Sequence, residues 1–307
     1  MIEEYIENQQ YKEALTLLNN MDDENTRYLR LVCLFGLQEY QQAQAEGYEA
    51  KTKATETYYD VVAIYVSILK ALEEYEEAIN IIIEELSMPY IPYQYEVTYN
   101  TAYDELLLAK KEANEGYDSH NHAFNNEDLE NVLIKEHPNE DVLYMALEQM
   151  QNMNIRRFVP MIRQFLTNES KPAFAKSLLF ELLVEQEVDE EMEIYKDQEM
   201  YYLNPSYAPM VLQQEVALEV MELLSHGLED ENPSLFLLCE QFLSFYLYSI
   251  FPKYIEEDSF SSLAGAIHYH VSTLQYIEVE LEDIELLYQC DKEEVLQWVS
   301  TFTTIIV

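Results

Sequence analysis

Three short segments decide the fold of this chain: residues 10–14 (QYKEA), 39–43 (EYQQA) and 74–78 (EYEEA). Each contains Tyr-x-x-Ala and continues into an amphipathic stretch, and the last two follow an apolar stretch after a short Leu-x-x step. The tyrosines are separated by 29 and then by 35 residues. A helix, a tight turn and a second helix opened by an aromatic residue, recurring at such intervals, predict an array of stacked helix pairs.

The helix pairs are predicted at 2–8 with 10–20, 25–36 with 39–50, and 57–71 with 74–86. In the third pair, apolar residues at helical spacing form two facing stripes: Val62, Tyr65, Val66 and Leu69 on the first helix, and Tyr75, Ala78, Ile79, Ile82 and Ile83 on the second. We interpret Tyr-x-x-Ala as a packing motif. The aromatic ring fills the wedge between the two helices, and the small residue one turn later lets them approach closely.

These pairs resemble degenerate tetratricopeptide repeats in the residues that open each second helix: Tyr11 and Ala14, Tyr40 and Ala43, Tyr75 and Ala78. Gly36 and Ala71 lie near the ends of two first helices, where the repeat also carries a small residue. The chain departs from the family pattern in its irregular spacing and in lacking the proline at the repeat end. The resemblance covers about the first third of the chain and implies a right-handed α-solenoid, but it implies no particular ligand.

The rest of the chain is predicted to be helical except for one hairpin. Helices are expected at 139–150, 154–166 and 170–185, with Ser170 as the cap of the last and Pro160 kinking the second or shortening its first turn. These pairs resemble HEAT-type repeats. Alternating polar and apolar residues at 191–195 and 199–203, around residues 196–198 (KDQ), predict a β-hairpin that lies on the helices.

The sequence therefore predicts an all-α protein in four parts: helical repeats in 1–115, further repeats in 126–187, the hairpin in 188–204, and an acidic helical domain in 205–307. The last part is expected to hold helices at 210–225, 233–251, 259–276, 282–289 and 292–306. Its apolar end, from Val295 to residue 307, is expected to cap the array, with self-association as the alternative. This order of elements is similar to a group of repeat proteins from low-GC Gram-positive bacteria.

The charge of the chain is strongly negative, with 17 basic against 59 acidic residues and a formal net charge of −42. Nucleic-acid binding and attachment to anionic membranes both require basic surface, so the sequence disfavours both. A negative field attracts basic proteins, although charge also serves solubility alone. Because 49% of the residues are hydrophobic, the chain is expected to fold despite this charge.

The protein is predicted to be cytoplasmic. Its three cysteines are far apart in apolar settings, as expected of core residues in a reducing compartment. The first residues lack the basic and apolar runs of a secretion signal. Residues 234–251 are apolar and near spanning length, but they carry Glu240 and Gln241 and have acidic flanks. We interpret them as a buried helix, with a membrane segment as the alternative.

A row of tyrosines provides the first candidate site. Tyr95, Tyr99 and Tyr103 are four residues apart in a predicted long helix that follows Tyr90 and Tyr93, so they share one face. Tyrosine offers a rigid contact area with a polar tip, which suits a surface that recognises a partner. The alternative interpretation is packing between helices.

A basic cluster provides the second candidate site. Within residues 154–177, five basic residues stand against one acidic residue, Glu169: Arg156, Arg157, Arg163, Lys171 and Lys176. Such a cluster suits the carboxylate, C-terminal tail or phosphate of a partner, because arginine makes bidentate contacts with these groups. The alternative is that the cluster pairs with acidic groups of this protein or of a second copy.

No catalytic, cofactor or metal motif is recognised. Glycines do not fall at phosphate-loop or dinucleotide spacing, and the common hydrolase and metalloprotease patterns are missing. His268 and His270, two apart on a helix, diverge by about 200°. His120 and His122, on a predicted loop, lack a matched set of further ligands. The sequence predicts neither metal nor cofactor, although a triad assembled from distant residues would escape a motif search.

Three functions remain open. The first is a non-catalytic adaptor that binds a peptide or protein segment on the concave face of the solenoid. The second is an acidic protein that sequesters a basic or nucleic-acid-binding partner. The third is an enzyme whose site lies between helical domains. The sequence leaves partner identity and oligomeric state open.

Overall fold

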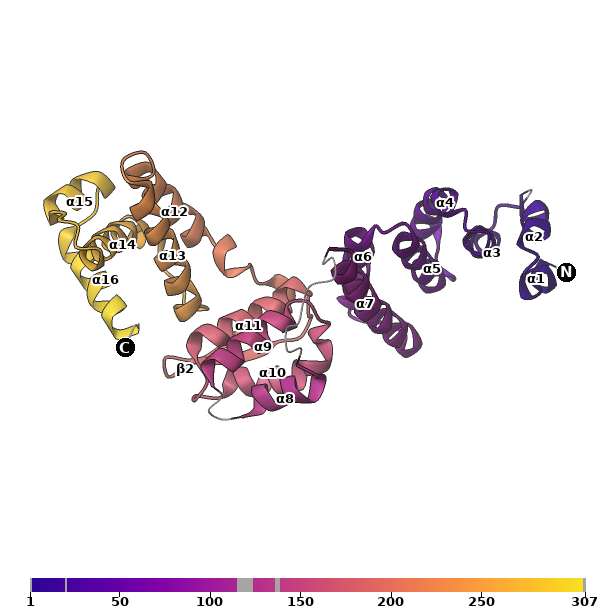
Figure 1. The fold of residues 1–307 in the computed structure, drawn as a ribbon, viewed down its shortest axis with the longest axis horizontal. Helices are drawn as coiled ribbons and strands as arrows, with labels where there is room; N and C mark the ends of the chain where they lie inside the picture. Colours follow the sequence, from indigo (N-terminus) through magenta and orange to yellow (C-terminus); the bar gives the residue numbers. More distant parts are fainter. Residues whose placement is uncertain (1, 20, 115–123, 136–138, 306–307) are drawn as a thin grey trace. The chain divides into compact units, whose positions relative to one another are not determined.

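The computed structural model describes residues 2–19, 21–114, 124–135 and 139–305 (Figure 1). They divide into two compact units, Met1–Ala123 with Asn152–Asn154, and Phe124–Gln151 with Ile155–Val307. The predicted boundary near residue 115 lies outside the described residues. The boundaries predicted at 187/188 and 204/205 lie inside the second unit and stay predictions.

The first unit consists of helices in sequence: α1 (Ile2–Glu7), α2 (Tyr11–Leu18), α3 (Glu24–Gly36), α4 (Tyr40–Lys53), α5 (Tyr58–Ala71), α6 (Tyr75–Leu86) and α7 (Tyr93–Asn114). Each helix contacts the next one along the chain, and α5 also contacts α3 and α7. Contacts that run only to neighbouring pairs are the hallmark of a repeat array. The helix pairs predicted from the three Tyr-x-x-Ala segments are therefore confirmed.

The same turn joins the two helices of each pair. Gln9, Gln38 and Glu73 all adopt left-handed backbone angles, with φ of 59°, 60° and 63°. The following N–H group bonds back to the carbonyl five residues earlier in each case, over 2.7–3.0 Å. This is a Schellman ending, and it satisfies carbonyl groups that the helix end leaves open. Tyr11, Tyr40 and Tyr75 then begin the second helices.

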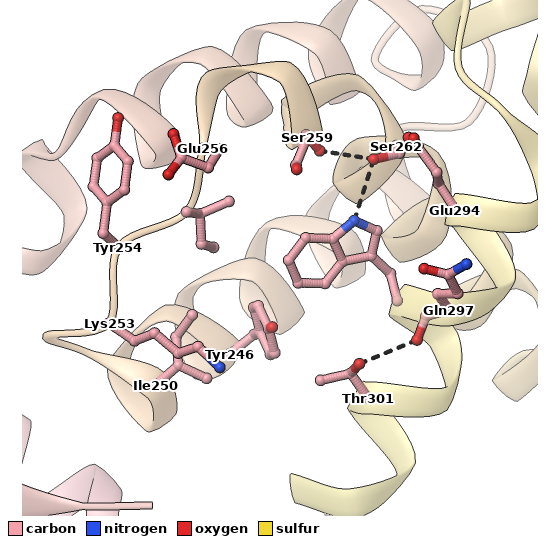
Figure 2. Close-up of a pocket in the computed structure, with 12 residues that line it drawn as sticks. Tyr246, Ile250, Lys253, Tyr254, Glu256, Ser259, Ser262, Glu294, Gln297 and Thr301 are labelled. Carbon is pink, nitrogen blue, oxygen red and sulfur yellow. Dashed lines mark hydrogen bonds between the residues drawn. The ribbon is translucent and has the colours of Figure 1, made fainter. Parts of the chain in front are cut away.

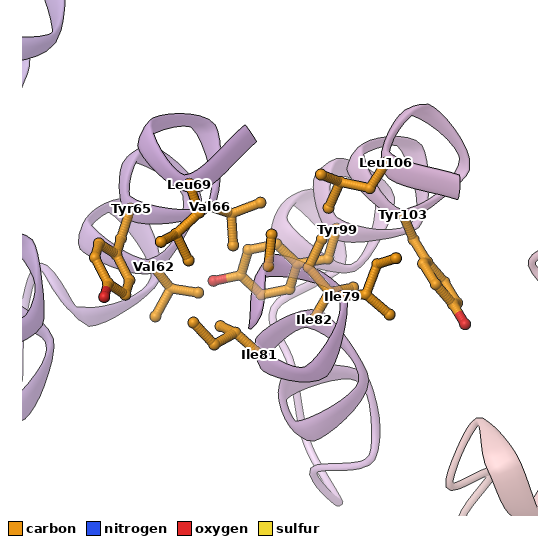
Figure 3. Close-up of a cluster of buried hydrophobic side chains, with 11 residues drawn as sticks. Val62, Tyr65, Val66, Leu69, Ile79, Ile81, Ile82, Tyr99, Tyr103 and Leu106 are labelled. Carbon is orange, nitrogen blue, oxygen red and sulfur yellow. The ribbon is translucent and has the colours of Figure 1, made fainter. Parts of the chain in front are cut away.

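Close helix packing explains the small residues of the pattern. Ala14, Ala43 and Ala78 are completely buried. A Cβ atom added to Gly36 would lie 2.5 Å from the Tyr11 ring, so the tyrosine of one pair packs directly on the backbone of the next pair's first helix. The predicted apolar stripes of α5 and α6 meet in a core that also takes in α7 (Figure 3).

The second unit begins with α8 (Asn126–Ile134), α9 (Glu140–Met150), a 3-10 turn (Ile155–Phe158), α10 (Val159–Thr167) and α11 (Ala173–Glu185). Pro160 lies in the first turn of α10, where a missing N–H group costs nothing. The predicted cap of α11 is wrong: Pro172 occupies the N-cap position, and the Ser170 hydroxyl instead bonds the side chain of Asn168.

The predicted β-hairpin is confirmed as β1 (Met192–Lys196) paired antiparallel with β2 (Glu199–Leu203). Asp197 and Gln198 have φ of 49° and 65°, the left-handed pair of a two-residue hairpin turn. Met192 and Ile194 are buried, and β1 contacts α10. The hairpin therefore lies on the helices, as expected of an isolated pair of strands.

The unit ends in α12 (Glu215–Leu228), α13 (Pro233–Ile250), α14 (Phe260–Leu274), α15 (Leu281–Tyr288) and α16 (Lys292–Ile305). The helix predicted from residue 210 begins later, because a 3-10 turn (Val211–Gln213) precedes α12. Helix α13 contacts α11, α12, α14 and α16, which confirms its prediction as a packed helix. None of the helices in the described ranges has both the length and the apolar character needed to cross a membrane. Val295 and Phe302 of α16 are fully buried. Capping of the array by this end stays a prediction, with self-association as its alternative.

Candidate functional site

The predicted tyrosine row lies mostly inside the first unit. Tyr99 and Tyr103 are 1% and 3% exposed, and both belong to the core of α5, α6 and α7 (Figure 3). The Tyr99 hydroxyl donates to the Tyr59 carbonyl over 3.0 Å. The recognition surface predicted at these two residues is therefore wrong, because a partner cannot reach buried rings. The alternative, packing between helices, describes them.

Tyr95 is half-buried and differs from the other two. Its ring stacks on that of Tyr59 with centroids 5.0 Å apart, and its hydroxyl donates to Asp60 over 2.7 Å. Hydrogen bonding to this carboxylate raises the pKa of Tyr95. Tyr90 and Tyr93 are largely exposed, at 77% and 79%. An accessible aromatic surface therefore lies at the start of α7 and in the segment before it.

Two lysines of the predicted basic cluster are buried and bonded inside the second unit. Lys171 donates to the carbonyl of Lys135 and places its ammonium group 4.7 Å from the centre of the Phe165 ring. Lys176 donates to the carbonyl of Tyr195 over 2.5 Å and is 2% exposed. Burial lowers the pKa of Lys176 to about 8. The site predicted at Lys171 and Lys176 is wrong, because both groups are enclosed.

The arginines of the cluster hold the segment that follows α11. Arg156 donates to the carbonyl of Gln186. Arg163 bonds the carboxylate of Glu190 over 2.6 Å and the carbonyl of Glu191 over 2.7 Å. Arg157 keeps an exposed side chain and lies 5.7 Å from the centre of the Phe158 ring. The ion pair of Arg163 with Glu190 is a pairing of the kind that the alternative interpretation describes, and backbone carbonyl groups accept further hydrogen bonds from Arg156 and Arg163.

Sequence reasoning missed a further buried lysine, Lys196, at the end of β1. Its ammonium group donates to the Ser177 hydroxyl over 2.6 Å and to the Tyr248 carbonyl over 3.2 Å. Burial, with a smaller contribution from Lys176, lowers the pKa of Lys196 to about 7. Its place beside the turn of the hairpin gave no signal of burial, and its ammonium group is enclosed by contacts with residues of α11 and α13.

A hollow in the C-terminal helices is the candidate binding site. It has a volume of about 460 Å³ and lies between α13, the loop that leads into α14, and α16 (Figure 2). We call it the aromatic pocket. Its lining includes three aromatic side chains, two carboxylates and one ammonium group: Tyr246, Tyr254, Trp298, Glu256, Glu294 and Lys253. This volume falls within the usual range of pockets that bind small molecules.

The indole ring of Trp298 is held in a fixed orientation in the aromatic pocket. Its Nε1–H group donates to the Ser262 hydroxyl over 3.2 Å, and that hydroxyl donates to the Ser259 carbonyl over 3.0 Å. The ring meets Tyr246 edge-on at 6.3 Å, and Tyr246 meets Phe302 edge-on at 4.9 Å. These contacts fix the indole ring as part of the pocket lining, and Figure 2 shows Ser259, Ser262 and Tyr246 around the same hollow.

A second hollow, of about 390 Å³, lies beside α12 and α15. His268 lines it, is 7% exposed, and its Nδ1 atom is 3.0 Å from the Tyr288 hydroxyl. Burial lowers the pKa of His268 to about 4, so the ring is neutral near pH 7. A single buried histidine bonded to a tyrosine is explained by packing and needs no ligand.

The structure offers no metal centre in the residues that it describes. No group of three or more His, Cys, Asp or Glu side chains is arranged to hold an ion there. His120 and His122 lie outside the described residues. Lys176, Lys196 and His268, whose pKa values are lowered by burial, are all engaged in the hydrogen bonds described above.

The stacked helix pairs, their common turn and their aromatic-to-small packing define an α-solenoid of the tetratricopeptide-like class. Residues 37–290 match the family described as "Protein of unknown function (DUF3196)", and the chain belongs to that family. It is similar to the TPR repeat-containing protein YsoA of Bacillus subtilis (strain 168), with 22% identity over 298 residues that cover 94% of this chain and 87% of that protein. The resemblance to repeat proteins of low-GC Gram-positive bacteria, which the sequence indicated, is thereby confirmed.

Proposed function

We propose that the protein is a non-catalytic adaptor that binds a peptide or protein segment. The observation that carries this proposal is the array of stacked helix pairs in the first unit, because such arrays present extended surfaces to partners. The exposed rings of Tyr48, Tyr90 and Tyr93 offer contact area on that unit. We place the adaptor in the cytoplasm and the bound segment on the concave face of the array.

The net charge favours a second candidate function. A formal charge of −42 attracts basic proteins at low salt, so the chain would sequester such a partner without a specific groove. The two functions differ in their dependence on salt. Recognition in a groove is retained at moderate salt, whereas attraction by the overall field is largely screened.

The experiment is site-specific photocrosslinking with the full chain in a lysate of its source cells, at low and at moderate salt. A photoreactive phenylalanine analogue replaces Tyr48 or Tyr93 in the first unit, or Tyr276, which is 96% exposed in the second. The adaptor predicts one protein crosslinked at moderate salt from Tyr48 or Tyr93 and not from Tyr276. Crosslinks to many basic proteins that disappear with salt would establish sequestering, and the absence of crosslinks at either salt would overturn both candidates.

Charge reversal in the basic cluster is not a suitable test. Arg156 and Arg163 hold the backbone between α11 and β1, so glutamate at these positions would disturb the second unit rather than a free binding surface. The crosslinking positions are exposed side chains, and their substitution leaves the core unchanged.

A further inference from the structure

We propose that the aromatic pocket binds one arginine or lysine side chain of a basic protein segment. The inference rests on the proposed function and adds to it a defined site in the second unit and a chemical preference. The pocket is distinct from the surface of the first unit that the adaptor proposal uses. Nothing in the sequence motifs indicated it, because its residues come from two separate stretches of the chain, 246–262 and 294–301.

Aromatic walls and carboxylates are the combination that recognises an organic cation. Tyr246, Tyr254 and Trp298 line the pocket, and tryptophan is the aromatic residue that attracts a cation most strongly over its face. Glu256 and Glu294 are exposed and stand apart in the lining, Glu256 beside Tyr254 and Glu294 near Gln297 (Figure 2). A guanidinium or ammonium group over the indole ring would therefore share the pocket with two carboxylates of the lining.

The surroundings also favour a cation over an anion. Residues 205–307 contain two lysines and 18 acidic residues, a net charge of −16. Lys253 is the one basic residue of the lining, and it lies near Ile250, across the pocket from Glu294 (Figure 2). An anion would have to enter against the field of the whole region to reach this single ammonium group.

The pocket is open to a side chain that arrives from the surface of a partner. Tyr254 is 68% exposed, whereas Tyr246 is 3% exposed and closes the inner end. The stem of an arginine or lysine would pack along the apolar walls, with its charged head at the carboxylates. A fully apolar side chain would offer neither carboxylate a partner, so we expect it to bind less tightly than arginine or lysine.

Trp298 is the single tryptophan of the chain, so its fluorescence reports directly on the pocket. The probes are three acetylated and amidated pentapeptides, Gly-Gly-X-Gly-Gly, in which X is arginine, its neutral isostere citrulline, or glutamate. At constant ionic strength, the arginine peptide is expected to change the Trp298 emission saturably, and the other two are not. Glu256→Gln with Glu294→Gln should weaken binding by roughly tenfold, since it removes the charge from both acceptors.

Two further variants distinguish binding inside the aromatic pocket from attraction by the overall negative charge of the chain. Glu219→Gln with Glu222→Gln removes the same charge from the exposed surface of α12 and should leave the affinity within about twofold. Lys253→Gln removes the one positive charge of the lining and should strengthen binding of the arginine peptide. Circular dichroism of every variant checks that the helices are intact.

Three results of these titrations would contradict or change the proposal that the pocket binds a cationic side chain. Equal binding of the citrulline peptide, or no saturable change up to the solubility limit of the arginine peptide, would overturn the proposal. Binding of the glutamate peptide that is lost in Lys253→Gln would make the pocket an anion site instead. Because the crosslinking experiment reports on Tyr48 and Tyr93, a negative result here leaves the adaptor function standing.

Discussion

Lys196 of β1 donates a hydrogen bond to the hydroxyl of Ser177 on α11, over 2.6 Å. Ser177 donates in turn to the Tyr248 carbonyl on α13, over 2.6 Å. One buried ammonium group thus connects the hairpin with two helices. The pKa of Lys196 is about 7 and that of neighbouring Lys176 about 8, both below the ordinary 10.5 because of burial.

These two lysines contribute stability to the second unit that increases as pH rises from about 7 to 9.5. Their pKa values are lower in the folded chain than in the unfolded chain, so the unfolded chain binds more protons in this range. Each lysine adds a slope of about 1.4 kcal/mol per pH unit once its folded form is neutral. In Lys196→Met, the slope between pH 8 and 9.5 should fall by about 1.4 kcal/mol per pH unit, as measured by urea unfolding followed through Trp298 fluorescence.

The exposed Lys253 supplies the control for this prediction. Lys253→Met removes a lysine that stands in solvent, so its unfolding free energy should keep the pH slope of the unmodified protein. An unchanged slope in Lys196→Met would show that Lys196 is solvated in the folded protein.

The buried Glu85 pairs with the half-buried Tyr58 in the first unit. The Tyr58 hydroxyl donates to Oε1 of Glu85 over 2.5 Å, and Glu85 is 1% exposed. Burial raises the pKa of Glu85, so its contribution to stability declines as pH rises above the ordinary 4.5. Tyr58→Phe removes the donor and should destabilise α5–α7 by about 1–3 kcal/mol.

The double variant Tyr58→Phe with Glu85→Met replaces both partners by apolar groups and should recover most of this loss at pH 7. Amide hydrogen exchange in α5, α6 and α7 measures the local stability of each variant. If the double variant were as unstable as the sum of the two single variants, the pair would not be coupled.

The sequence predicted the fold better than the binding sites, and the reason is physical. Tyr40 and Ala43 act through local helix geometry and contact with the adjacent helix, which the sequence pattern contains. The burial of Tyr99 was open to either interpretation, because a tyrosine row looks alike in a core and on a surface. The aromatic pocket could not be predicted, since Tyr246 and Trp298 are brought together only by the packing of α13 and α16.

The repeated turn predicts a stabilising substitution. Gln38 has φ of 60°, a conformation that is strained for residues with a Cβ atom and free for glycine. Gln38→Gly should therefore stabilise α3 and α4 by about 0.5–1 kcal/mol. Gln42→Gly, four residues later on the exposed side of α4, should destabilise by about 1 kcal/mol, and hydrogen exchange of both helices compares the two.

At Gly47, the packing of the neighbouring helix predicts the opposite effect on stability from the one that helix propensity predicts. Within α4, alanine would ordinarily stabilise by about 1 kcal/mol relative to glycine. A Cβ atom at Gly47 would, however, lie 2.5 Å from the Tyr65 ring, which is 2% exposed and tied to Glu77 through its hydroxyl. Gly47→Ala should thus destabilise the first unit by about 1–3 kcal/mol in thermal or urea unfolding. A stabilised variant would show that the Tyr65 ring moves aside freely.

His268 predicts how the C-terminal helices respond to acid. Its folded pKa of about 4 lies below the ordinary 6.5, so protonation favours the unfolded chain. Stability that is complete above pH 6.5 is lost as pH falls toward 4. Between pH 6.5 and 5, the unmodified protein should lose about 2 kcal/mol more than His268→Gln, in which glutamine keeps a polar partner for Tyr288. Unfolding followed through Trp298 fluorescence measures both, and the exposed His226→Gln should match the unmodified protein. Equal acid sensitivity in all three proteins would place the His268 ring in contact with water rather than in the buried bond to Tyr288.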